Sequence, residues 1–278
     1  MYREVPRNHN SESNRQLTMQ LIDAKKEELL TFFENSKLFS KNETLKKIVE
    51  TFVPILAQSY GIRSRQREIN DAGEQIPAAN HSISVAKLML RAYEKLQGNP
   101  AIQNLAAPKV LLAASLLHDL QEDGKMSFDE IEKFLRKTEF FFAEEITQIL
   151  EILEKISRKK TENSEESTPN YLGRIAENPN AIFIKFHDVV NNSLSSQSKK
   201  QKKKMPHYIN FFSTPDRKFL MGTLAFLEHL KIIKNNTHIG EFMKNLDTYN
   251  LPKKNKKILK KIQTDFQKKV RECSNSKS

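Results

Sequence analysis

The feature of this sequence that most constrains its fold is an apolar run leading directly into a histidine and an aspartate. Residues 110–117 read Val-Leu-Leu-Ala-Ala-Ser-Leu-Leu, and His118 and Asp119 follow at once. Pro108 suits the first turn of a helix, and Gly124 suits the position just past its end. Because the run is apolar on every face, we predict a central buried helix that ends beside two ionisable side chains.

The composition favours helices over sheets. The 278 residues include 38% hydrophobic residues and 17 Phe, but only 7 Gly and 10 Pro. A turn-rich β-fold needs more glycine and proline than this. We therefore expect an all-α protein with one main core and appended helices.

Hydrophobic periodicity and capping signals divide the chain into segments. We predict helices at about 16–33, 45–60, 81–96, 108–124, 139–158, 182–192, 214–234 and 253–270, with a short helix opened by the Ser127–Glu130 capping box. The first twelve residues are expected to be disordered, and 61–77 and 159–169 to be loops. The predicted division is 1–44, a polar segment and helix; 45–194, the core; and 195–278, a basic linker with C-terminal helices.

Positive charge is concentrated at the end of the chain. Residues 193–278 hold 20 of the 46 basic residues but only 6 of the 34 acidic ones, and the net charge of the whole is +12. Residues 199–204 are nearly pure lysine, which is typical of a solvated linker. Contact between 195–278 and nucleic acid or another anionic surface is the alternative interpretation.

Cysteine usage and the absence of long apolar segments bear on the compartment. Cys273 is the single cysteine, so neither an intramolecular disulfide nor a multi-cysteine zinc cluster can form. Residues 1–30 lack the pattern of a signal peptide, and no apolar stretch approaches the roughly 20 residues of a membrane span. We expect a cytoplasmic protein without a transmembrane segment.

Ionisable groups on apolar helices indicate a metal site. Burying His118 and Asp119 costs several kcal/mol unless a partner compensates, and a divalent cation does so. Asp188 repeats this situation within the apolar stretch 181–190. The alternatives are a core histidine hydrogen-bonded to its neighbour and, for Asp188, an intrahelical ion pair with Lys185.

Helical spacing adds further residues to this predicted pocket. Glu122 lies one turn after His118 with Asp123 beside it, so this carboxylate pair could orient a water and handle protons. Lys185 and Asn192 flank Asp188 at i−3 and i+4. Lys185 could neutralise a phosphate or pair with Asp123, and Asn192 could hydrogen-bond a sugar. His187 is expected to pack or to lie at the pocket rim, and His229 to lie on the surface.

In their order, these motifs resemble the HD superfamily, and specifically the branch containing the hydrolase domain of the Rel/SpoT alarmone enzymes. The resemblance covers about 60–194. His81-Ser-Ile-Ser-Val-Ala resembles the first-ligand motif, and 114–123 resembles the His-Asp…Glu-Asp signature. The segment 171–192 resembles the helix with the Lys-x-x-Asp-x-x-x-Asn pattern. The resemblance implies that His81 is a metal ligand together with His118, Asp119 and Asp188.

The resemblance implies an HD-domain helical bundle with one divalent ion, Mn²⁺ most often, although two nitrogen and two oxygen ligands also suit Fe²⁺ or Mg²⁺. It implies removal of the 3′-pyrophosphate from guanosine 3′,5′-bis(pyrophosphate), ppGpp. Arg67, or Arg63 or Arg65, would join Lys185 and Asn192 in binding this nucleotide. Val189 stands where the family has arginine, and nothing in the chain corresponds to a synthetase domain, so the protein would be a hydrolase only.

Two alternatives remain open. The same metal site could hydrolyse a nucleoside monophosphate, a dNTP or a cyclic nucleotide. Alternatively, the protein could be a non-catalytic module that binds nucleic acid or an acidic partner through 195–278, in which case binding should depend strongly on salt.

Overall fold

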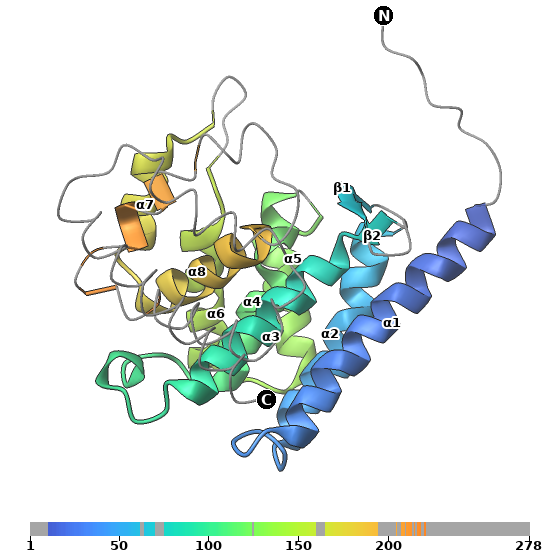
Figure 1. Ribbon diagram of the computed structural model, residues 1–278, viewed down its shortest axis with the longest axis horizontal. Coiled ribbons are helices and arrows are strands. Elements are labelled where there is room, and N and C mark those ends of the chain that lie inside the picture. Colours follow the sequence, from blue (N-terminus) through green and yellow to red (C-terminus); the bar gives the residue numbers. More distant parts are fainter. Residues whose placement is uncertain are drawn as a thin grey trace, which may run out of the picture.

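A computed structural model describes residues 11–61, 64–69, 75–123, 125–159, 165–193 and ten residues between 204 and 220. The helices it contains are α1 (Ser11–Asn35), α2 (Glu43–Tyr60), α3 (Ala79–Lys95), η1 (Pro100–Ile102), α4 (Pro108–Glu122), α5 (Phe128–Thr138), α6 (Ala143–Ile156), α7 (Thr168–Ile175) and α8 (Pro179–Ser193). The two strands are β1 (Ser64–Ile69) and β2 (Gln75–Pro77). The predicted all-α class is confirmed (Figure 1).

Helix α4 occupies the centre of the bundle. It packs against α2, α3, α6 and α8, and α3 in turn contacts α1 and α8. Ten residues of α4 are buried, namely the continuous run from Val110 to His118 and, after it, Leu120. The predicted central helix is confirmed, and its burial on all sides explains why its apolar residues show no amphipathic stripe.

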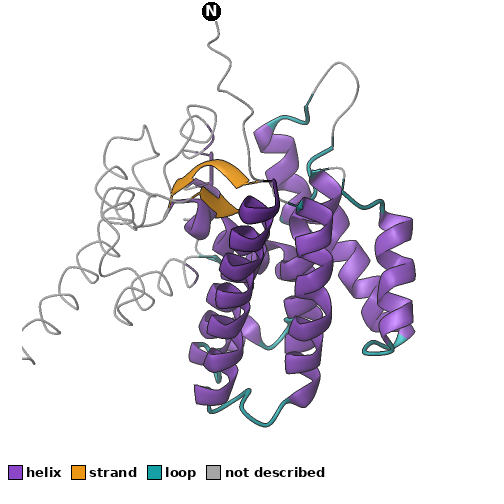
Figure 2. Cartoon of the chain, turned by 90° about the vertical axis from the view of Figure 1, so that its right-hand side faces the viewer, coloured by secondary structure: helices purple, strands orange, loops and turns teal. Residues whose placement is uncertain are grey.

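The connection from α2 to α3 differs from the prediction. Residues 61–77 were expected to be a loop, but β1 and β2 pair as an antiparallel hairpin in which Ser64 lies opposite Pro77. The hairpin lies at one end of the bundle and contacts α1 and α3 (Figure 2). Its pairing satisfies backbone donors and acceptors, which does not require the alternation of apolar residues that would reveal a strand in the sequence.

Helix boundaries follow local capping chemistry. The Ser127–Glu130 capping box is confirmed: Ser127 Oγ accepts from Glu130 N at 3.2 Å, and Ser127 N donates to Glu130 Oε2 at 2.8 Å. The predicted start of the next helix at 139 is wrong. Glu139 has a φ of 57° and ends α5, and α6 begins only after Phe142, whose N–H donates to Glu145 Oε2.

Segments on both sides of the predicted core contribute to one hydrophobic core. Helix α1 buries Ile22, Leu29 and Phe33, and residues beyond 194 bury Phe212 and Leu220 in the same cluster. Helix α1 also begins earlier than predicted, at Ser11. The division at 44 and 194 stays a prediction. The expected disorder of the first twelve residues is wrong for residues 11 and 12, which belong to α1, and residues 1–10 and the expected helix at 253–270 lie outside the described residues.

None of the described helices combines the length and the apolar character that a membrane crossing requires.

The buried position of α4 makes a stability prediction. Leu116 is fully buried, so Leu116→Ala should lower the free energy of unfolding by about 2–5 kcal/mol, measured by urea denaturation followed by circular dichroism. Leu38, which is 42% exposed, provides the control, and Leu38→Ala should cost less than about 1 kcal/mol. Equal losses in the two variants would contradict the central position of α4.

Candidate metal centre

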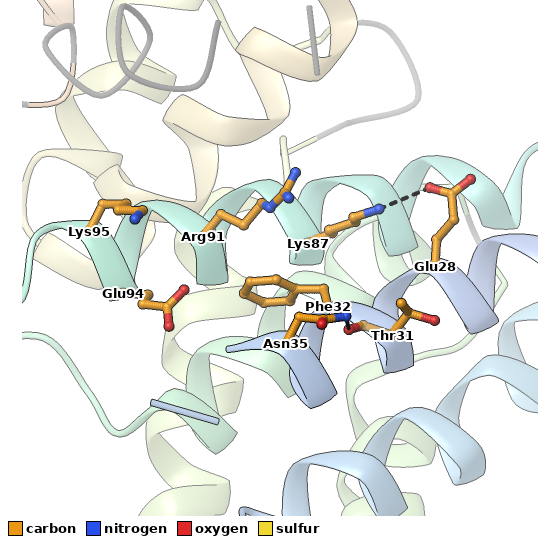
Figure 3. A pocket seen from close by; sticks show the side chains of 8 residues that line it. All are labelled: Glu28, Thr31, Phe32, Asn35, Lys87, Arg91, Glu94 and Lys95. Carbon is orange, nitrogen blue, oxygen red and sulfur yellow. Dashed lines mark hydrogen bonds and ion pairs between the residues drawn. The ribbon is translucent and has the colours of Figure 1, made fainter. Parts of the chain in front are cut away.

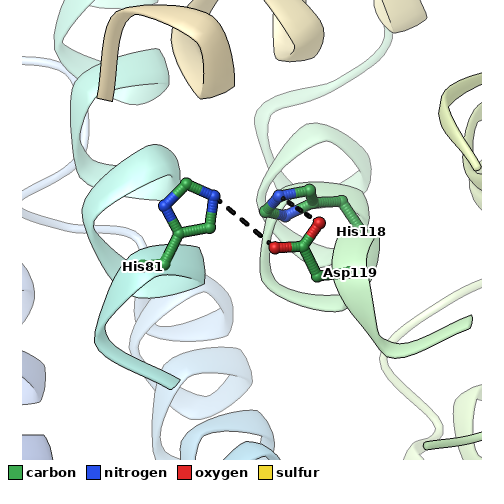
Figure 4. Close-up of side chains that lie close together, drawn as sticks. All are labelled: His81, His118 and Asp119. Carbon is green, nitrogen blue, oxygen red and sulfur yellow. Dashed lines mark ion pairs between the residues drawn. The ribbon is translucent and has the colours of Figure 1, made fainter. Parts of the chain in front are cut away.

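Three helices bring the predicted ligands together. His81 comes from the first turn of α3, His118 and Asp119 come from the last turn of α4, and Asp188 comes from α8. His81, His118 and Asp119 each offer a ligand atom, and these atoms lie within 4.8 Å of one another. Figure 4 shows these three side chains turned toward one another between α3 and α4.

Each histidine ring is oriented by a hydrogen bond on its far side. His81 Nδ1 contacts Asn191 Oδ1 at 2.7 Å, and His118 Nδ1 contacts the carbonyl oxygen of Ser115 at 2.8 Å. Because both partners are acceptor oxygens, each ring carries its proton on Nδ1 when neutral. The lone pairs of both Nε2 atoms are thereby directed to the centre of the cluster, as in histidines that bind metals.

Asp188 lies next to this group. Its Oδ1 lies 2.9 Å from His81 Nε2 and 3.9 Å from His118 Nε2. Asn192 Nδ2 also donates to Oδ1, at 2.6 Å, and Lys185 Nζ pairs with Oδ2 at 2.6 Å. The intrahelical pair with Lys185 is therefore present, and it leaves Oδ1 facing the two imidazoles.

The ionisable groups of the cluster stabilise one another's charged forms. Burial disfavours protonation of His118, but the carboxylates of Asp119 and Asp188 outweigh it and raise the pKa of His118 to about 9. Burial likewise opposes ionisation of Asp119 and Asp188, yet the histidines, and Lys185 for Asp188, hold both carboxyl pKa values below their usual range. The pKa of Lys185 lies well above its ordinary value, since Asp188 outweighs the burial of the ammonium group.

The donor set fits a divalent cation. Buried polar atoms normally have a hydrogen-bond partner, but His118 Nε2 is buried and makes no hydrogen bond within the described part of the chain, although Asp119 Oδ1 lies 3.1 Å away. Two imidazole nitrogens beside two ionised carboxylates are ligands that Mn²⁺, Fe²⁺ and Zn²⁺ accept. These residues could hold such an ion, with Asn191 as the orienting partner of His81.

Glu122 and Asp123 have different surroundings. Glu122 is half-buried, accepts from the backbone N–H of Arg158 at 3.3 Å, and lines a cavity of about 480 Å³. Asp123 is exposed at the end of α4, and its side chain is not among those lining this cavity. None of the four predicted metal ligands is among the residues that line this cavity, so the catalytic role of Glu122 and Asp123 stays a prediction.

The other predicted residues are placed as follows. Lys185, which was expected to neutralise a phosphate or to pair with Asp123, pairs with Asp188, and Asn192 also bonds Asp188. Arg67 lies on β1, and its side chain is outside the described residues. His187 packs between the rings of Phe183 and Phe186, and burial lowers its pKa to about 4, which confirms packing as its role. His229 lies outside the described residues.

Sequence reasoning missed the groups that support Lys185. The ammonium group lies 5.4 Å from the ring centroid of Tyr171 and 5.9 Å from that of Tyr208, and Arg158 stacks over Tyr171 at 4.1 Å. Asn191 was also missed, although it lies three residues after Asp188 and so shares its helix face. No local signal identifies Tyr208, because it follows the lysine-rich segment and reaches the site only through the fold.

Comparison with known families agrees with this geometry. Residues 78–193 match the HD domain family model. The match covers less than half of the chain, and for this part it supports the resemblance to the HD superfamily. The match spans α3 to α8 and includes all four predicted ligands. Searches of curated proteins and of solved structures returned no match.

The raised pKa of His118 predicts that metal binding competes with protons. A metal needs the neutral imidazole, whereas the metal-free site keeps His118 protonated below about pH 9. The apparent affinity for Mn²⁺ should therefore rise as the pH increases from 6 to 9, with about one proton released per ion near pH 7.5. Titration calorimetry in buffers of different ionisation enthalpy measures this release, and binding enthalpies identical in all buffers would contradict it.

The orienting role of Asn191 is a separate prediction. Asn191→Ala leaves His81 without the acceptor for its Nδ1–H, so Mn²⁺ affinity should fall about 10- to 100-fold. Asn14 is exposed on α1, and Asn14→Ala is the matched control. Calorimetric titration of both variants gives the comparison, and equal affinities would show that Asn191 does not position the ligand.

Proposed function

We propose that this protein is a metal-dependent phosphohydrolase of a nucleotide, with ppGpp as the leading substrate and pyrophosphate released from its 3′ position. The observation that carries the proposal is the convergence of two Nε2 atoms, each with its Nδ1 bonded to an oxygen, on two ionised carboxylates. The HD domain supports the reaction class. The Rel/SpoT resemblance of the His118-Asp119…Glu122-Asp123 motif supports the substrate.

In this proposal His81, His118, Asp119 and Asp188 hold one divalent ion, Mn²⁺ by preference. A bound ion of this kind lowers the pKa of water and polarises a phosphoryl oxygen. Lys185 and Asn192 keep Asp188 in place through their hydrogen bonds to its two oxygens. Their main role in this proposal is to position Asp188. Contacts with the nucleotide would use the N–H groups that are not bonded to Asp188.

Glu122 is the best placed residue for proton transfer. It follows His118 by one helical turn, is half-buried, and accepts a hydrogen bond from the backbone N–H of Arg158. Since Glu122 also lines the cavity of about 480 Å³, it can orient a water or accept a proton there. Asp123 is assigned a supporting role from the exposed end of the helix, and Arg67 a contact with the nucleotide.

The cavity beside Glu122 supports a small-molecule substrate. Its volume of about 480 Å³ is in the range of ligand-binding pockets. It is lined by Gln121, Glu122, Phe128, Glu154, Ser157, Arg158 and Lys159. The buried Ser157 Oγ has no hydrogen-bond partner in the described part of the chain, so a polar ligand could supply one.

The substrate is tested by a nucleotide screen. Full-length protein with Mn²⁺ should release pyrophosphate from ppGpp and leave GDP, both quantified by anion-exchange chromatography. The screen includes nucleoside monophosphates, dNTPs and cyclic nucleotides. Faster turnover of one of these would mean that it, and not ppGpp, is the substrate of the hydrolase. Glu122→Gln should lower kcat about 10²- to 10⁴-fold, since it removes the base.

The controls separate chemistry from folding. Glu151 is exposed on α6 and outside the cavity lining, so Glu151→Gln should keep full activity. His118→Ala should abolish turnover of every nucleotide. If no nucleotide is hydrolysed, or if His118→Ala leaves the rate unchanged, the proposed hydrolase function is wrong.

A further inference from the structure

A second cavity lies between α1 and α3, apart from the metal centre. It has a volume of about 280 Å³, and its lining consists of Glu28, Thr31, Phe32 and Asn35 of α1 and Lys87, Arg91, Glu94 and Lys95 of α3. Figure 3 shows Lys87, Arg91 and Lys95 in a row along α3 with Phe32 of α1 facing them. Arg91 follows His81 by ten residues, about 15 Å along the helix axis, so the cavity is not part of the metal site.

The acidic side chains of this cavity are already engaged. Glu28 Oε2 pairs with Lys25 Nζ at 2.9 Å and with Lys87 Nζ at 3.0 Å. Glu94 Oε1 accepts from Ser36 Oγ at 2.6 Å and from Leu38 N at 3.3 Å. Each carboxylate therefore has hydrogen-bond or ion-pair partners other than Arg91, although both attract its guanidinium group through space.

Arg91 is the exception. Its guanidinium carbon lies 5.5 Å from the ring centroid of Phe32, and no acceptor within the described residues makes a hydrogen bond or ion pair with it. Burial outweighs the attraction of Glu94 and Glu28 and places the pKa of Arg91 below its usual value. A half-buried guanidinium, planar and rich in donors, gains most from an oxyanion that accepts several N–H groups at once.

Other residues of the lining add hydrogen-bond donors to those of Arg91. Within the described residues, Lys87 Nζ makes one hydrogen bond, to Glu28, out of the three that an ammonium group can donate. Across the cavity, the Thr31 hydroxyl has no hydrogen-bond partner within the described part of the chain. Three cationic and two acidic residues leave the lining with one excess positive charge. Its charge and its donors both favour an anion that only accepts hydrogen bonds.

We propose that the α1–α3 cavity is a binding site for a small phosphate-bearing anion, with Arg91 as its principal contact and Lys87 and Thr31 as supporting donors. The volume exceeds that of a single phosphate and accommodates a pyrophosphate or a small phosphate monoester. The site is separate from the proposed hydrolytic centre, and α3 carries residues of both.

The test is calorimetric titration of the full-length protein with inorganic pyrophosphate, and in parallel with inorganic phosphate, at constant ionic strength. Arg91→Gln should weaken pyrophosphate binding at least about tenfold, because it removes the charge and the fork of donors. Thr31→Val should weaken it several-fold. Arg15→Gln removes the same charge from an exposed position on α1 outside the cavity and should leave binding unchanged.

A metal-site variant separates this proposal from the proposed function. Pyrophosphate binding that persists in His118→Ala and is lost in Arg91→Gln supports the α1–α3 site, whether or not any nucleotide is hydrolysed. Pyrophosphate binding that is lost in His118→Ala and kept in Arg91→Gln would overturn the proposal. Chloride that binds with the same affinity as pyrophosphate would also overturn it. Thermal unfolding shows whether Arg91→Gln is folded. If it is not, the Thr31→Val result decides, and unchanged binding in that variant rejects the site.

Discussion

Two hydrogen bonds on the outer sides of two imidazole rings determine what the centre of this bundle can do. Asn191 and the carbonyl group of Ser115 each accept from a histidine Nδ1, so both Nε2 atoms are directed toward Asp119 and Asp188. If either acceptor were a donor, the ring would present a proton instead of a lone pair to the cluster. The metal site therefore depends on groups that are not themselves ligands.

The packing of α4 explains why these hydrogen bonds persist. The helix is buried on all sides, and the carbonyl group that orients His118 belongs to the preceding turn of the same helix. Asn191 and Asp188 reach the site from α8, which packs against both α3 and α4. The low-dielectric surroundings strengthen the attraction between the carboxylates and the imidazoles, which is why the pKa of His118 rises despite its burial.

The sequence allowed much of the fold to be predicted, because helices leave a periodic pattern and capping signals such as Ser127–Glu130. The hairpin at 64–77 was not predicted, since its pairing uses backbone groups and its residues lack apolar alternation. The start of α6 was predicted too early. Glu139 adopts a left-handed backbone conformation that ends α5, and the spacing of apolar residues does not reveal such a conformation.

The candidate site divides in the same way. The four candidate ligands could be predicted because each lies in a short motif of the sequence: His81, His118, Asp119 and Asp188. In the structure these side chains lie close to one another. The partners of Lys185 could not be named, because Tyr171 and Tyr208 approach it from segments that only the tertiary fold brings together. Lys185 itself was expected to face a phosphate or Asp123, whereas in the folded chain its charge is matched to Asp188.

The central claim is that these four side chains bind one divalent ion. Elemental analysis of the full-length protein, loaded with Mn²⁺ and freed of excess ion by gel filtration, tests it most directly. The account predicts one ion per chain in the wild type and in His207→Ala, which alters an exposed histidine, and far less than one ion in His118→Ala. Equal metal content in all three proteins, or no retained ion in the wild type, would contradict it.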